Sequence, residues 1–137
     1  MALPTGHALA KGQAGAVLAL KKLSDQTFVV NRQSGAPRVM RDAVFAACNA
    51  SGFSPRVGQE APHVLSTLAL VAAGIGISIV PASLQHMKIR GVSYRHLTGS
   101  AQLKVPLTLA SRRGDTSAVL RQFVDLVRRR AKNYPGK

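Results

Sequence analysis

Residues 70–85 read LVAAGIGISIVPASLQ, and this stretch predicts a helix and a strand joined across two glycines. An apolar, helix-like run reaches Gly74, which suits the left-handed conformation that ends many helices. Gly76 has no Cβ, so two backbones can approach each other closely there. The β-branched run Ile77–Val80 then predicts a strand, which Pro81 ends. A nearly continuous apolar strand is typical of parallel sheets that helices cover on both faces.

Short β-rich runs precede and follow this stretch. The expected strands are Met1–Leu3, Thr27–Asn31, Arg56–Ala61, Val92–Leu97 and Lys104–Ser111, and Val17–Leu23 fits a short strand or a helical turn.

Three helices are expected between these strands and a fourth after the last strand, because apolar residues recur at helical spacing. The first starts at Pro37, buries Met40, Ala43, Val44 and Ala47, and ends at Gly52. The second starts at Pro62 and carries Val64, Leu65, Leu68, Ala69 and Ala72 on one side. A short helix covers Ala82–Lys88, and the last, residues 115–132, is capped by Asp115 and buries Leu120, Phe123, Val124 and Val127. Alternating strands and helices predict an α/β fold with an open, mostly parallel sheet.

The composition of the chain limits the classes of function that it can have, but it is compatible with several of them. The 137 residues are 46% hydrophobic, enough for one packed domain, and 19 basic against 5 acidic residues give a net charge of +14. Such a charge attracts nucleic acid, acidic surfaces or anionic small molecules, and it also serves as a solubilising field. No membrane span or signal peptide is expected, because the longest apolar run, residues 68–80, is too short and the N-terminus lacks a charged region before an apolar stretch. The single cysteine fits a reducing cytosol.

The residues offer no positive sign of catalysis. The five carboxylates form no paired motif, and Cys48 lies in an expected helix among apolar neighbours, where a core thiol is the simplest interpretation. The histidines share no metal-ligand spacing with one another or with Cys48. The two glycines at 74 and 76 follow a helix and precede a strand, the reverse of a dinucleotide fingerprint. We therefore expect no enzyme, no metal and no cofactor.

Small-molecule binding is the remaining function. In open α/β sheets, ligands bind at the carboxyl ends of strands, where helix N-termini present free N–H groups. Residues 31–36 form a polar loop after one strand, and residues 59–61 precede the second helix. These segments are equally compatible with ordinary connections made of turn residues. The candidate binding residues are Asn31, Arg32, Gln33, Ser34, Gly35, Gln59 and Glu60.

Five stretches, in order, resemble the effector-binding domain of LysR-type transcriptional regulators. They are LPTGHALA (3–10), LSDQTFVV (23–30), ACNASGFSPRVGQEA (47–61), LALVAAGIGISIVPAS (68–83), and VSYRHL (92–97) followed by VPLTLASRRGDTSAVLRQFVDLVR (105–128). The likeness covers essentially the whole chain, and it rests mostly on packing patterns.

The resemblance implies a two-lobed, periplasmic-binding-protein-like fold with a small molecule in its cleft. Residues 1–92 then correspond to the second lobe, and residues 93–137 to return strands and a last helix of an incomplete first lobe. The winged helix-turn-helix and most of the first lobe have no counterpart here. The resemblance therefore implies a truncated gene, a wrongly assigned start or a fragment of a regulator, whose DNA contacts would need a missing N-terminal domain.

Three hypotheses follow. The leading one is a cytoplasmic sensor of a small, anionic effector, a carboxylate, that controls transcription in a full-length context and self-associates. The alternative is a basic protein that binds nucleic acid non-specifically, which the net charge of +14 and the run Arg128-Arg129-Arg130 suggest. The third, an enzyme that uses Cys48, has no substrate to recommend it.

Overall fold

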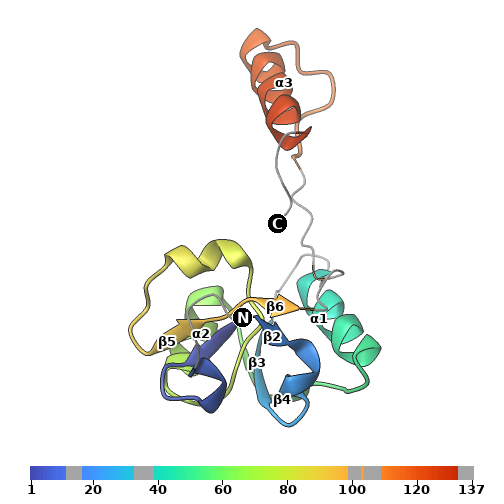
Figure 1. Cartoon of the computed structure of the whole chain (residues 1–137). Coiled ribbons are helices and arrows are strands. Elements are labelled where there is room, and N and C mark those ends of the chain that lie inside the picture. Colours follow the sequence, from blue (N-terminus) through green and yellow to red (C-terminus); the bar gives the residue numbers. More distant parts are fainter. Residues whose placement is uncertain (12–16, 33–38, 99–102, 104–108, 133–137) are drawn as a thin grey trace. The chain divides into compact units, whose positions relative to one another are not determined.

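The computed structural model describes residues 1–11, 17–32, 39–98, 103 and 109–132. The chain divides into two compact units, Met1–Val105 and Pro106–Lys137, and each is described by itself (Figure 1).

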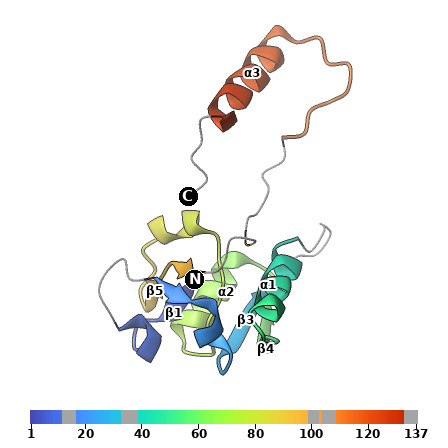
Figure 2. The same ribbon diagram turned by 45° about the vertical axis from the view of Figure 1, so that its right-hand side comes forward.

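The main sheet of the first unit contains parallel and antiparallel neighbours. Strand β3 (Thr27–Asn31) pairs in parallel with β4 (Arg56–Ala61), and β1 (Ala2–Pro4) pairs antiparallel with β5 (Val92–Tyr94). The pair β1 and β5 and the pair β3 and β4 can both be followed in Figure 2. The bounds of β3 and β4 are those expected from the sequence.

Ile77 and Ser78 connect these two pairs. Ile77 bridges Phe28 of β3 in parallel, and Ser78 bridges Ala2 of β1 antiparallel, so the lateral order is β5, β1, residues 77–78, β3, β4. The Ile77 N–H donates to the Thr27 carbonyl at 2.9 Å, and the Val29 N–H donates to the Ile77 carbonyl at 2.8 Å. The expected strand over residues 77–80 is therefore too long: only its first two residues join the sheet.

The glycines before this crossing behave as the sequence indicates. Gly74 ends the preceding helix with a φ of +81°. At Gly76, an added Cβ would lie 2.5 Å from the Thr27 carbonyl oxygen. The close approach of the chain to β3 therefore depends on the missing side chain of Gly76.

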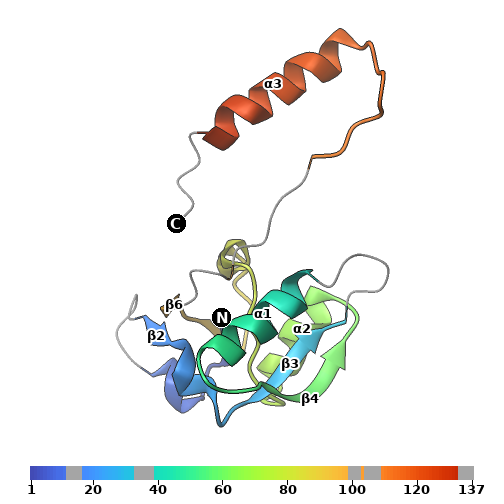
Figure 3. The same ribbon diagram turned by 90° about the vertical axis from the view of Figure 1, so that its right-hand side faces the viewer.

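Alternation along β3 separates the core into two clusters, one on each face of the sheet. Phe28 and Val30 pack with Val44, Ala47 and Cys48 of helix α1 (Val39–Ala50). The intervening Val29 packs on the opposite face, with side chains of helix α2 (Val64–Ala72). Figure 3 shows α1 and α2 against the sheet of β3 and β4. Helices on both faces of a largely parallel sheet give the expected α/β architecture.

The buried face of α1 is close to the one predicted. Val44 and Ala47 are buried, while Met40 and Ala43 are partly buried. Gly52 follows the helix with a φ of +86°, as a C-terminal glycine should.

The buried face of α2 differs from the prediction. Leu65 is 60% exposed, and Ala69 is also exposed, whereas Thr67, Leu68 and Val71 are buried. Burial thus follows the series 64, 67, 68, 71, which includes a threonine that hydropathy alone assigns to the surface. Thr67 can be buried because its hydroxyl donates to the His63 carbonyl at 3.1 Å.

The expected strand over residues 92–97 divides in two. After β5 ends at Tyr94, β6 (Leu97–Thr98) pairs in parallel with β2 (Leu18–Ala19). The segment expected as strand or helical turn, Val17–Leu23, contains both, since a 3₁₀ helix (Leu20–Leu23) follows β2 directly. Two further 3₁₀ helices cover Ala8–Ala10 and Ala82–His86. Of the strand expected at residues 104–111, residues 104–108 lie outside the described part, and 109–111 are not in a strand.

The second unit contains helix α3 (Ala118–Lys132). Its N-cap is Ser117 and not Asp115, because the Ser117 hydroxyl accepts from the Leu120 N–H at 3.4 Å. Asp115 supports the turn before the helix by accepting from the Ser117 N–H at 2.9 Å. The expected apolar stripe is present but not buried within the described residues: Phe123 is 51% exposed, and Leu120, Val124 and Val127 are partly exposed.

Candidate functional site

A pocket of about 210 Å³ opens at the carboxyl end of β3. Both core clusters contribute to its lining, the first through Phe28, Val30 and Val44 and the second through Val29. Its wall is mainly apolar, and its polar groups are concentrated at the end of β3 and the start of α1. The described lining comprises Phe28, Val29, Val30, Asn31, Arg32, Met40, Arg41, Val44, Phe45, Val64, Thr67, Ser78, Ile79, Val80 and Pro81.

Four local features of the fold create this pocket. Arg32 extends the ladder of β3, since its backbone N–H donates to the Ala61 carbonyl at 2.7 Å. Helix α1 begins next along the described chain, and its first two turns bring Met40, Arg41 and Val44 to the lining. The first turn of α2 contributes Val64 and Thr67. Residues 79–81 leave the sheet after Ser78 and form the remaining side.

The end of β3 supplies an acceptor and a cation. The Asn31 side-chain oxygen is buried, and it has no hydrogen-bond partner in the part of the chain that the structure describes. A buried acceptor without a partner is costly, so this atom favours a ligand that donates a hydrogen bond. Arg32 is exposed, and its guanidinium makes no hydrogen bond or ion pair within the described residues. Within the described part of the chain, no side chain competes with an anion for the Arg32 guanidinium.

A second cation, Arg41, is already paired. Its Nη1 donates to Glu60 Oε1 at 2.7 Å, and its guanidinium carbon lies 5.3 Å from the centroid of the Phe45 ring. The ion pair is partly shielded, since the Arg41 and Glu60 side chains are 27% and 35% exposed. An ion pair and a cation–π contact together restrict the orientation of this guanidinium beside the pocket.

The structure brings together some of the residues predicted as binding residues. Asn31 and Arg32 line the pocket, and Glu60 contacts it through Arg41. Gln59 is exposed outside the described lining, and its amide donates to the Glu60 carbonyl at 3.2 Å. Gln33, Ser34 and Gly35 lie outside the described residues.

Arg41 is a charged lining residue that the sequence interpretation missed, as it missed the uncharged Thr67 and Ser78. Helical periodicity places position 41 beside the buried face of α1, where a charged residue is normally assigned to solvent. A usable signal was nonetheless present: Arg41 occupies the first turn of a helix that follows the carboxyl end of a strand, which is the usual place for ligand contacts in α/β sheets.

Groups that could support other chemistry lie elsewhere. Cys48 is fully buried in the cluster beneath α1, and burial raises the pKa of its thiol. The described residues include no group of three or more His, Cys, Asp or Glu side chains placed to hold a metal ion. His7 is engaged in hydrogen bonds with Gln26 and the Leu9 N–H.

Cys48 should be unreactive in the native protein. Thiolates are the reactive species, and both burial and a raised pKa suppress them. We expect labelling by a thiol reagent at pH 8 to be about a hundredfold slower in buffer than in concentrated urea, because the thiol reacts only after the core opens. Fast labelling of the folded chain would contradict the buried position of Cys48 and would support the hypothesis of an enzyme that uses its thiol.

In the described part of the chain, no helix is both long enough and apolar enough to cross a membrane.

Comparison with known proteins identifies the family. Residues 1–132 match the LysR substrate binding domain. The regulator CatR of Pseudomonas putida is 30% identical over 129 residues, which cover 94% of this chain and 43% of CatR. The regulator TfdS of Cupriavidus pinatubonensis is 34% identical over 110 residues, covering 80% of this chain and 37% of TfdS. The chain thus spans less than half the length of these relatives.

Solved structures agree with the sequence match. CbnR, a LysR family transcriptional regulator, superposes with a TM-score of 0.78 at 26% identity, covering 93% of this chain and 43% of CbnR. The BenM effector-binding domain with its effector benzoate gives a TM-score of 0.59 at 29% identity, covering 71% of this chain and 43% of that one. The fold is therefore the periplasmic-binding-protein-like α/β fold of these domains, and the chain belongs to the LysR substrate-binding domain family.

Proposed function

We propose that this chain senses a small carboxylic acid in the pocket at the end of β3. The observation that supports this most directly is the composition of the pocket. An apolar wall meets two guanidinium groups, those of Arg32 and Arg41, and the side-chain oxygen of Asn31, an acceptor with no partner among the residues that the structure describes. Predominantly apolar pockets with a few convergent polar groups are the usual form of small-molecule sites.

The volume of the pocket and the chemistry of its lining favour a compact organic acid as the ligand. The volume of about 210 Å³ exceeds the roughly 150 Å³ of an engineered apolar cavity that binds benzene. A ring or short unsaturated chain can therefore contact the apolar wall while its carboxylate faces an arginine. Guanidinium groups bind carboxylates through parallel, charge-assisted hydrogen bonds. Asn31 favours a second group on the ligand, such as a hydroxyl, that can donate a hydrogen bond.

A neighbouring structure supports this ligand class. The effector of the BenM domain is benzoate, an aromatic carboxylate. We infer that the ligand of this chain belongs to the same chemical class.

The role in transcription also belongs to the proposal, because the chain spans less than half the length of its regulator relatives. We propose that it acts without catalysis, in the cytoplasm, as the sensing part of a self-associating regulator whose DNA contacts come from another segment. Residues 1–92 would form the second lobe and residues 93–137 would return to the first. The partly exposed apolar stripe of α3 would then be covered in the larger assembly.

Thermal unfolding of the 137-residue chain tests the proposed sensing function. Benzoate, shikimate and other small carboxylates are added one at a time, and the neutral benzamide serves as the matched control for benzoate. An acid at a hundred times its dissociation constant stabilises the fold by about 2.7 kcal/mol, which raises the midpoint by several degrees. A cooperative transition that no carboxylate shifts at millimolar concentration would contradict the proposal.

The alternative function, non-specific binding of nucleic acid, is tested by measuring how the affinity for DNA depends on salt concentration. Binding through phosphate contacts weakens steeply as salt rises, because counterions are released. DNA affinity that falls by orders of magnitude between 50 and 200 mM salt would support that alternative, whereas absent binding would remove it.

A further inference from the structure

The partner of Arg41 is itself a carboxylate. Glu60 lies on the edge strand β4, opposite Val30 of β3, and its Oε1 is 2.7 Å from Arg41 Nη1. Arg41 and Phe45 line the pocket, whereas Glu60 is outside the described lining. A protein carboxylate thus already holds one of the two cations that an acidic ligand would use.

The two pocket arginines therefore differ in availability. The Arg32 guanidinium makes no hydrogen bond or ion pair in the described part of the chain. The Arg41 guanidinium has five N–H donors, so it can keep one bond to Glu60 and offer others to a ligand. The negative charge of Glu60 nevertheless remains beside Arg41, and it disfavours a second anion at that guanidinium.

We propose that Glu60 is an internal competitor that lowers the affinity of the pocket for carboxylates and so sets the ligand concentration at which the site responds. This inference rests on the proposed function, because it concerns an acid in the same pocket. The ligand carboxylate binds Arg32 and competes with Glu60 for Arg41. Glu60 thereby acts through Arg41 without touching the ligand.

Competition by Glu60 affects the affinity of the pocket for carboxylates, whereas a purely structural ion pair would not affect carboxylates selectively. Removing the charge of Glu60 leaves Arg41 without its anionic partner and removes a repulsion, so carboxylate affinity rises. A neutral ligand of the same shape gains nothing from this change. The ratio of the two affinities therefore separates competition from a general effect on the shape of the pocket.

The test compares Glu60→Gln with the wild-type chain. Gln is nearly isosteric and keeps an oxygen that can accept from Arg41, and the partly exposed pair contributes little to stability. Asp42→Asn is the matched control, since Asp42 is an exposed acid adjacent to Arg41 in α1 and its replacement changes the net charge equally. Benzoate and benzamide binding are measured by calorimetric titration, and a thermal melt confirms that each variant is folded.

We expect Glu60→Gln to bind benzoate about fivefold more tightly, with benzamide binding unchanged and Asp42→Asn equal to wild type. The gain should disappear in Glu60→Gln combined with Arg41→Gln, because the freed cation is then absent. Equal or weaker benzoate binding in Glu60→Gln would overturn the competitor role while leaving the carboxylate pocket intact. Absence of benzoate binding from both the wild type and Glu60→Gln would overturn the competitor role together with the proposed benzoate-class ligand.

Discussion

Replacing Gly76 with alanine will lower the free energy of unfolding by about 2–4 kcal/mol, the range typical of overpacking combined with disturbed backbone hydrogen bonds. The new Cβ would lie 2.5 Å from the Thr27 carbonyl oxygen and 3.2 Å from the Thr27 carbonyl carbon. That oxygen accepts the hydrogen bond from the Ile77 N–H. The clash therefore involves backbone that holds residues 77–78 against β3, and no side-chain rotation relieves it.

Gly6→Ala is the matched control for this substitution. Gly6 lies in an exposed turn, and an added Cβ there meets nothing within 4 Å. Urea unfolding followed by circular dichroism gives the midpoint for each variant, and we expect Gly6→Ala to remain within about 0.5 kcal/mol of wild type, as surface changes usually do. Equal midpoints for Gly76→Ala and Gly6→Ala would show that the sheet crossing tolerates a side chain.

The sequence predicted those elements whose signals are local. Gly74 and Gly76 marked the end of α2 and the approach to β3, and β-branched residues marked Thr27–Asn31. The buried apolar face of α1 was also predictable, because its apolar residues recur at helical spacing. These features depend on neighbours a few residues apart, so periodicity captures them.

The errors arose where distant contacts decide the outcome. Burial of Thr67 requires a hydrogen bond to the His63 carbonyl, which hydropathy does not register. The strand at residues 77–80 ends early because Ser78 pairs with Ala2, far away in the sequence, after which the chain leaves to border the pocket. Similarly, the break after Tyr94 reflects a change of pairing partner from β1 to β2.

The candidate site was predictable in position but not in its complete set of residues. The rule that ligands bind at carboxyl ends of strands pointed to Asn31 and Arg32, and both line the pocket. Arg41 was missed because its importance depends on Glu60, nineteen positions away, and on the Phe45 ring. Such convergence of separate elements becomes visible only when the helix is placed against the sheet.

Reversing the charge of Arg32 will produce the largest effect on ligand binding. In Arg32→Glu, the pocket loses a guanidinium that has no partner among the described residues, and it gains a carboxylate near the one brought by the ligand. Because both changes oppose an anion at short range, we expect benzoate to bind at least about thirtyfold more weakly. Binding of the neutral benzamide should change little, since the apolar wall is retained.

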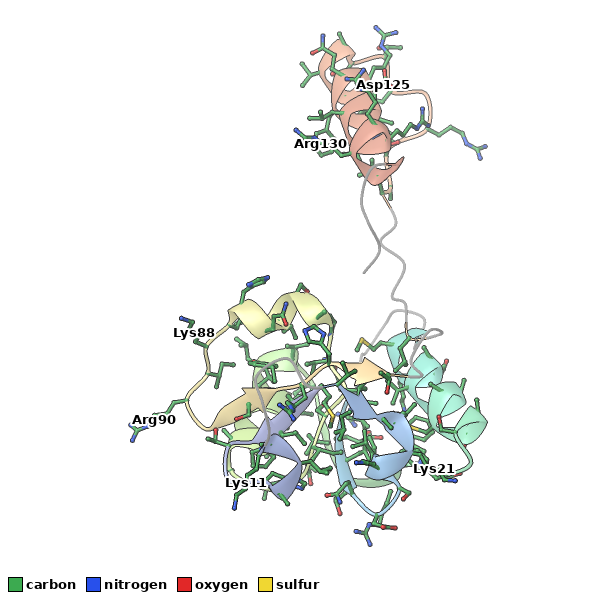
Figure 4. All side chains as sticks on the ribbon, viewed as in Figure 1. Lys11, Lys21, Lys88, Arg90, Asp125 and Arg130 are labelled. Atoms are coloured by element: carbon green, nitrogen blue, oxygen red, sulfur yellow. The ribbon has the colours of Figure 1, made fainter. Side chains whose placement is uncertain are left out.

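Lys21→Glu separates this local effect from the general field of a chain with a net charge of +14. Lys21 is exposed in the 3₁₀ helix Leu20–Leu23 and is labelled in Figure 4, and its reversal alters the net charge by the same two units. It is not among the described lining residues of the pocket. Calorimetric titrations at 0.15 M salt, where distant surface charges are screened, should leave benzoate affinity in Lys21→Glu near that of wild type. Equal losses in Lys21→Glu and Arg32→Glu would mean that the whole positive surface, and not a contact at the end of β3, attracts the acid.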